Sequence, residues 1–72
     1  MLKKIRELKQ ILRRAGFSEI PGKGSHSNWI HQLYRGKITI AGKDGIDAKP
    51  YQEKEVLQAL QEVRRRQADE QT

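Results

Sequence analysis

The residues best suited to chemistry lie in one short segment, Lys23-Gly24-Ser25-His26. The unperturbed pKa of histidine lies close to neutrality, so His26 can both accept and donate a proton. Gly24 and Ser25 are small and leave room for a bulky ligand to approach the backbone. The ammonium group of Lys23 suits a phosphate. The segment therefore indicates a proton-transferring histidine beside a bound phosphate, which favours RNA as the ligand.

Other chemistries fit the sequence less well. No Ser–His–Asp arrangement supports Ser25 as a nucleophile, and a contact from its hydroxyl to phosphate fits better. Asp44 and Asp47 lack the ligand count of a calcium loop, so turn formation and helix capping suit them better. The chain has no cysteine, which excludes disulfides and thiolate sites. Since His26 and His31 are the only histidines, we expect no metal and no other cofactor.

The charge of the chain favours a polyanionic partner. Lysine and arginine number 15 against 9 acidic residues, which gives a net charge of +6 over 72 residues. A single domain of this size buries about 60% of the surface exposed by its unfolded chain, so chemistry belongs in a shallow groove. No apolar run approaches the roughly 20 residues that span a bilayer. The N-terminus does not resemble a secretory signal. We therefore expect a cytoplasmic protein with no membrane association.

Local patterns predict two helices and three strands. Apolar residues at helical spacing predict a helix over residues 3–15, ended by Gly16. Alternating segments predict strands at 17–20, 27–34 and 37–41, with Arg35-Gly36 as the tight turn between the last two. Pro50 should open a second helix that Arg64, Arg65 and Arg66 close.

This element order predicts an α+β fold. Short connections favour an antiparallel meander, and two amphipathic helices should pack together on one face of its sheet. The other face, and the loop that carries His26, should stay open to solvent. We expect one domain over residues 1–66, followed by a polar, frayed C-terminal tail over residues 67–72.

Several short segments together have a recognisable pattern: Ala15-Gly16-Phe17, Lys23-Gly24-Ser25-His26, Trp29, Lys37-Ile38-Thr39-Ile40 and Asp47-Ala48-Lys49-Pro50-Tyr51-Gln52. With them, the chain resembles the HicA family of mRNA interferase toxins over about residues 2–63. The resemblance implies a fold similar to the double-stranded-RNA-binding domain. It also implies metal-independent cleavage of mRNA, with His26 as the catalytic residue, and inhibition by a HicB-type antitoxin. We expect such an antitoxin to be acidic and to cover His26.

The chemistry of RNA suits a histidine base. RNA carries its own nucleophile, the 2′-OH beside the scissile phosphate, and neutral His26 can take its proton. We expect Lys23 to stabilise the developing charge, and the products to carry a 2′,3′-cyclic phosphate and a 5′-OH. His31 is the candidate acid for the leaving oxygen. However, residues 26 and 31 differ by an odd number, so a regular strand points them to opposite faces unless a bulge intervenes.

The same alternation places Trp29 and Ile30 on opposite faces of the strand. We expect Trp29 to be in the core, and the alternative is a platform on which an RNA base stacks. The predicted RNA contacts are Lys23, Gly24, Ser25, Arg35 and Lys37.

The sequence is also compatible with two other functions. The first is a non-catalytic RNA-binding module of the same fold, which would contact duplex RNA through two basic surfaces, one of them at residues 64–66. The second is a protein-interaction domain whose basic surface docks an acidic partner.

Overall fold

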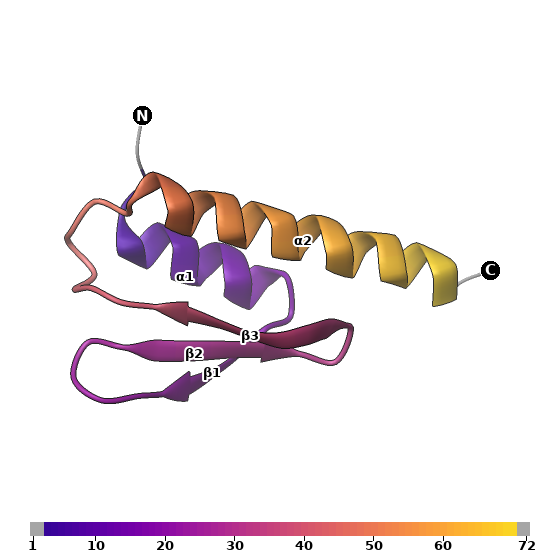
Figure 1. The fold of residues 1–72 in the computed structure, drawn as a ribbon, viewed down its shortest axis with the longest axis horizontal. Coiled ribbons are helices and arrows are strands. Elements are labelled where there is room, and N and C mark those ends of the chain that lie inside the picture. Colours follow the sequence, from indigo (N-terminus) through magenta and orange to yellow (C-terminus); the bar gives the residue numbers. More distant parts are fainter. Residues whose placement is uncertain (1–2, 71–72) are drawn as a thin grey trace.

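The structure, a computed structural model, describes residues 3–70 (Figure 1). Its elements follow the predicted order of helix, three strands and helix, so the predicted α+β fold is confirmed. They are α1 (Ile5–Arg14), β1 (Ser18–Pro21), β2 (Ser27–His31), β3 (Tyr34–Ile40) and α2 (Pro50–Glu70).

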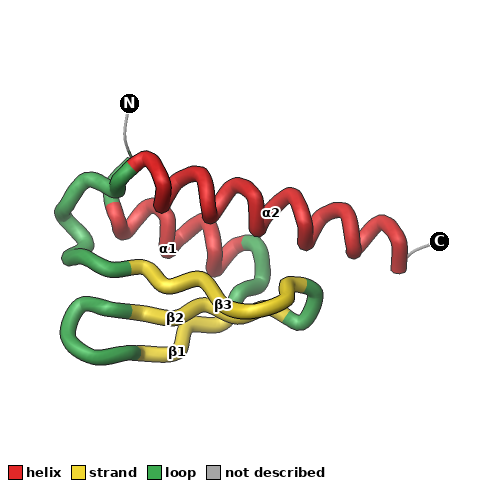
Figure 2. The backbone as a smooth tube through the Cα atoms, in the orientation of Figure 1, coloured by secondary structure: helices red, strands yellow, loops and turns green. Residues whose placement is uncertain are grey.

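The three strands form one antiparallel sheet in the order β1-β2-β3. Both helices lie on the same face of this sheet, as expected, and the other face is open (Figure 1). The β1–β2 loop and the β3–α2 loop lie at the same end of the sheet (Figure 2). This end is also where Ser27 of β2 pairs with both Pro21 of β1 and Ile40 of β3. Two loops distant in sequence are therefore brought together beside the first turns of α1.

The hydrophobic core lies between the sheet and the helices. It confirms the prediction for Trp29, which is 0% exposed, while its neighbour Ile30 faces outward and is 40% exposed. Side chains from both helices and from β2 and β3 supply most of it: Ile5, Leu8, Leu12, Trp29, Ile38, Ile40, Val56, Ala59 and Val63.

The turn between β2 and β3 is not where the sequence placed it. The prediction of a turn at Arg35-Gly36 is wrong, because the chain reverses at Gln32 and Leu33. β2 ends at His31, whose ring Nδ1 accepts a hydrogen bond of 2.9 Å from the Leu33 N–H. A side chain therefore closes this turn in place of a glycine.

Gly36 instead serves an irregularity inside β3. Between the pairs Trp29–Ile38 and His31–Tyr34, β2 contributes one residue and β3 contributes three, residues 35–37. Gly36 has a φ of +83°, which an L side chain rarely adopts. A glycine that permits a bulge looks the same in sequence as one that permits a turn.

The last helix extends beyond its predicted end. We expected Arg64–Arg66 to close it, but α2 continues to Glu70. Gln67 and Ala68 are good helix formers, and neither glycine nor proline interrupts this segment. Residues 67–70 of the expected frayed tail are therefore helical, and residues 71–72 lie outside the described residues. Within residues 3–70, no helix is long and apolar enough to cross a membrane.

Candidate functional site

The loop that carries His26 is a tight reverse turn. The His26 N–H donates a 3.0 Å hydrogen bond to the Lys23 carbonyl, so Gly24 and Ser25 are the central residues of the turn. Gly24 has a φ of +60° and Ser25 does not have a positive φ, as in a type II′ turn. Apart from its chain neighbours, no residue has an atom within 4 Å of where a Gly24 side chain would begin, which agrees with the predicted room for a ligand.

Gly22 closes the base of this loop. Its N–H donates to the His26 carbonyl at 3.0 Å, which brings the two backbones together. A Cβ on Gly22 would lie 3.2 Å from the His26 carbonyl oxygen and 3.3 Å from the His26 Cβ. Both contacts are tighter than van der Waals packing normally allows, so any larger residue here would move His26.

The hydrogen bond of the His26 ring defines its chemistry. Its Nδ1 lies 3.1 Å from the Lys23 carbonyl oxygen, and the side chain is exposed. Because a carbonyl oxygen can only accept, Nδ1 must carry the hydrogen of this bond. In the neutral ring, Nε2 then bears a free lone pair. The geometry therefore favours the neutral tautomer whose Nε2, rather than Nδ1, can accept a proton.

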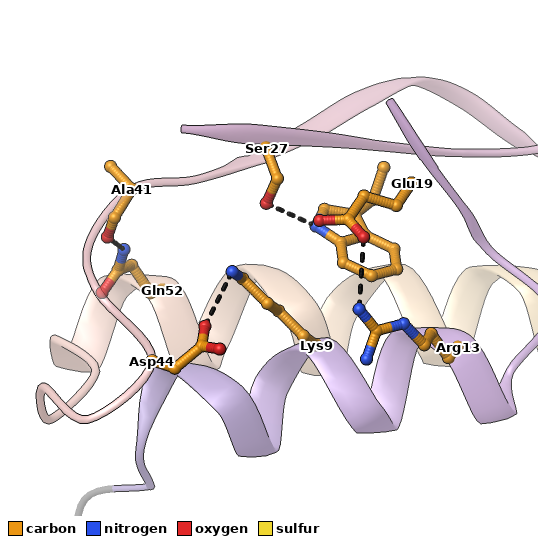
Figure 3. Close-up of polar contacts among 8 residues, drawn as sticks. Lys9, Arg13, Glu19, Ser27, Ala41, Asp44 and Gln52 are labelled. Atoms are coloured by element: carbon orange, nitrogen blue, oxygen red, sulfur yellow. Dashed lines mark hydrogen bonds and ion pairs between the residues drawn. The ribbon is translucent and has the colours of Figure 1, made fainter. Parts of the chain in front are cut away.

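His26 lines a surface groove of about 380 Å³. The groove runs between the β1–β2 loop and residues 42–44 of the β3–α2 loop, and Glu19 and Lys9 also line it. Lys9 reaches this place from α1, and its side chain points toward Asp44 and the sheet (Figure 3). A shallow groove is what the size of the chain predicted.

The acidic groups of the groove are paired with cations. Lys9 Nζ lies 2.8 Å from Asp44 Oδ1, and Arg13 lies 3.2 Å from Glu19 Oε1 (Figure 3). The hydrogen bond from Lys9, and then its charge, hold the pKa of the Asp44 carboxyl below its ordinary value. Within residues 3–70, the exposed side chains of Lys23 and Lys43 form no salt bridge, so both are available to an anion.

Trp29 forms a hydrogen bond with Ser27, the residue that follows His26. Its indole Nε1 donates a 3.0 Å hydrogen bond to Oγ of buried Ser27. The Arg13 guanidinium covers the indole ring, 5.4 Å from its centroid. Because no surface of Trp29 is exposed, the alternative of a base-stacking platform is wrong.

The structure does not bring His31 to the groove. Five residues of β-strand separate it from His26, or about 16 Å at about 3.3 Å per residue. The irregularity of the sheet lies in β3 and does not shorten this path. The His31 ring packs against Phe17 with centroids 5.0 Å apart, and its Nδ1 closes the β2–β3 turn. The site therefore offers no support for His31 as the acid.

The predicted RNA contacts fall into two groups. Lys23, Gly24 and Ser25 adjoin His26, and all three are exposed. Arg35 and Lys37 are also exposed, but they lie at the irregular part of β3, toward the other end of the sheet. The structure therefore places one group at the candidate base and the other at a distance from it.

Sequence reasoning missed Lys9 and Lys43 as groove residues. The position of Lys9 held a usable signal, because it follows Ile5 by four residues and precedes Leu12 by three, so it borders the buried stripe. No local pattern indicates its partner Asp44, which is 35 residues away.

Metal-ligating side chains are not grouped anywhere in the part of the chain that the structure describes. Among residues 3–70, no three histidine, aspartate or glutamate side chains lie together in a way that could hold an ion.

Comparison with protein families identifies the chain. The sequence model of the HicA toxin of bacterial toxin–antitoxin systems matches residues 5–62, from the first residue of α1 into α2. The chain belongs to the HicA toxin family. No curated protein and no solved structure matches it. As a HicA toxin, it is the toxic member of a pair and has an antitoxin as its partner. The matched segment includes His26 and every other groove residue named above.

Proposed function

We propose that this HicA toxin is an endoribonuclease that cleaves mRNA without a metal, with His26 as general base. The hydrogen bond between His26 Nδ1 and the Lys23 carbonyl carries the proposal, because it leaves Nε2 free to accept a proton. His26 is exposed beside Lys23 and Lys43, which form no salt bridge within residues 3–70, and this supports access for a long polyanionic substrate.

The reaction needs one proton acceptor on the protein. Nε2 of His26 takes the proton of the 2′-OH as this oxygen attacks the neighbouring phosphorus. The bond between phosphorus and the 5′-oxygen breaks, and that oxygen takes a proton from water. The products are a 2′,3′-cyclic phosphate and a 5′-OH, and His26 returns its proton to solvent. DNA lacks the 2′-OH and should not be cut.

The residues around His26 bind the substrate in this proposal. The Lys23 ammonium attracts the backbone phosphates, while Gly24 and Ser25 let them approach the turn closely. Arg35 and Lys37 contact the same RNA farther along the open side of the sheet. The antitoxin is of HicB type, and it inhibits the toxin by covering the His26 groove.

The experiment is cleavage of a defined RNA by purified protein in the presence of a chelator. We expect wild type to yield cyclic-phosphate ends, and His26→Ala to lose activity by about 10²-fold or more. His31→Asn is a matched histidine control, because its side-chain oxygen can still accept the Leu33 hydrogen bond. It should cleave nearly as fast as wild type.

Two outcomes would count against the proposal. Equal cleavage by wild type and His26→Ala would assign the activity to another residue or to a contaminant. A folded wild type that binds RNA and leaves it intact would instead support the non-catalytic RNA-binding module.

A further inference from the structure

Lys9 is the most shielded lysine or arginine among the salt bridges of residues 3–70. Its side chain is 15% exposed, whereas the paired side chains of Lys4, Arg13 and Arg66 are 40%, 57% and 35% exposed. Because most of this side chain is covered, the positions that its ammonium can take are restricted. Lys9 lines the same groove as His26.

Asp44 holds the Lys9 ammonium in place. Its Oδ1 accepts a hydrogen bond of 2.8 Å from Lys9 Nζ (Figure 3). The backbone of Asp44 is itself anchored to α1, since its carbonyl accepts from the Arg6 N–H at 3.3 Å. Two residues later, the Ile46 carbonyl accepts from the Ile5 N–H at 2.9 Å. The loop therefore anchors the backbone of Asp44, and the Asp44 carboxylate holds the ammonium through one hydrogen bond.

The ammonium retains unused hydrogen-bonding capacity. It carries three N–H donors, and the bond to Asp44 uses one of them. Within residues 3–70, Lys9 forms no other side-chain hydrogen bond. A second acceptor can therefore bind the ammonium while its hydrogen bond to Asp44 remains in place.

We propose that the Lys9 ammonium, oriented by Asp44, binds a non-bridging oxygen of the scissile phosphate in the His26 groove. This inference rests on the proposed ribonuclease function and adds a catalytic residue to it. Lys9 transfers no proton. It donates a hydrogen bond to an oxygen whose negative charge grows as the 2′-oxygen attacks. A charge held in position before the reaction stabilises a transition state better than a mobile one, so Lys9 takes the electrostatic role first expected of Lys23.

The test compares two lysines that are paired in the same way. Lys9→Met keeps an apolar stem and removes the charge. Lys4→Met is the matched control, because Lys4 also pairs with an aspartate of the β3–α2 loop, Asp47 at 2.6 Å, but does not line the groove. We expect Lys9→Met to lower the single-turnover cleavage rate by 10²- to 10³-fold. Lys4→Met should stay within about twofold of wild type, with both variants folded by circular dichroism.

A second measurement separates this proposal from the ribonuclease proposal. Binding of an RNA with a 2′-deoxy substitution at the cleavage site requires no chemistry. Lys9→Met should reduce the slope of log affinity against log salt by about 0.7, the value for one lost phosphate contact to a single strand. If wild type does not cleave but this slope changes, the ribonuclease proposal fails and Lys9 remains a phosphate ligand. If Lys9→Met cleaves and binds as Lys4→Met does, the role of Lys9 is overturned.

Asp44 is a positioning residue in this proposal, and it should affect binding and catalysis in opposite directions. Asp44→Asn removes a negative charge from the groove, so RNA should bind more tightly. The Lys9 ammonium loses its charged anchor, so the single-turnover rate should fall by about tenfold. If Asp44 had a purely structural role, Asp44→Asn would lower both the RNA affinity and the single-turnover rate. Parallel losses in affinity and rate would therefore contradict the positioning role.

Discussion

At the scale of single residues, backbone geometry prepares His26 for its proposed role. The Lys23 carbonyl accepts hydrogen bonds from both the backbone N–H and the ring Nδ1 of His26. The same peptide group thus shapes the turn and selects the tautomer of the ring. Gly24 permits the turn through its positive φ, and Gly22 permits the close approach at its base. The small residues around this histidine are therefore required by the loop that presents it as well as by the space a ligand needs.

Gly22→Ala should impair catalysis more than folding. The new Cβ would displace the His26 backbone by a few tenths of an ångström, because it would begin 3.2 Å from the carbonyl oxygen. Small misplacements of a catalytic group are costly, so we expect cleavage to fall by about tenfold. The free energy of unfolding should change by about 1 kcal/mol or less. Gly45→Ala is the control, since nothing lies within 4 Å of its Cβ position. Equal rates for the two variants would show that the approach of Gly22 to His26 does not matter.

At the scale of elements, the β3–α2 loop connects the groove to both helices. Buried Gln52 of α2 donates to the Ala41 carbonyl at 3.1 Å (Figure 3). Its Oε1 accepts from the Lys49 N–H at 2.8 Å. One side chain thus joins the two ends of the loop. The segment 47–52, which carried part of the family resemblance, therefore has a structural role that positions Asp44 and Lys43 at the groove.

The limits of sequence reasoning also appear among the elements. Helical and strand periodicity is local, so the order of the elements, the burial of Trp29 and the open loop of His26 could be predicted. The β2–β3 turn could not, because a histidine side chain closes it and Gly36 serves a bulge. The pair of Lys9 and Asp44 could not be predicted either. It exists only because α1 and a loop 35 residues away pack against each other.

The docking of the β3–α2 loop on α1 should depend on pH through Asp44. The bond from Lys9 lowers the pKa of this carboxyl in the folded protein below its ordinary value. A lowered carboxyl pKa stabilises the folded state above the ordinary pKa, and this contribution is lost as pH falls through the folded value. Wild type should therefore be more stable than Asp44→Asn at neutral pH. The two unfolding free energies should converge in urea titrations as pH falls through this lowered pKa. A difference in unfolding free energy between wild type and Asp44→Asn that stays constant over this pH range would contradict the pairing of Asp44 with Lys9.

At the scale of the whole molecule, the candidate base and its groove lie at one end of the sheet. The β1–β2 loop, the β3–α2 loop and the first turns of α1 meet there, while the opposite end carries the β2–β3 turn (Figure 2). The net charge of +6 attracts any polyanion, but the candidate base occurs only beside this groove. A partner can therefore block the proposed chemistry by covering one end of the toxin, and it need not enclose the whole chain.

The antitoxin should protect the lysines of this end from chemical modification. If it covers the groove, Lys23 and Lys43 should become unreactive toward an amine-acetylating reagent when the inhibited complex is formed. Both are exposed in the free chain, and among residues 3–70 neither forms a salt bridge. Lys54, exposed on α2 within the helical layer, serves as the internal control and should react equally in both states. Mass spectrometry of peptides from the free toxin and the complex would measure all three. Reactive Lys23 and Lys43 in a fully inhibited complex would mean that the antitoxin acts elsewhere and changes the groove from a distance.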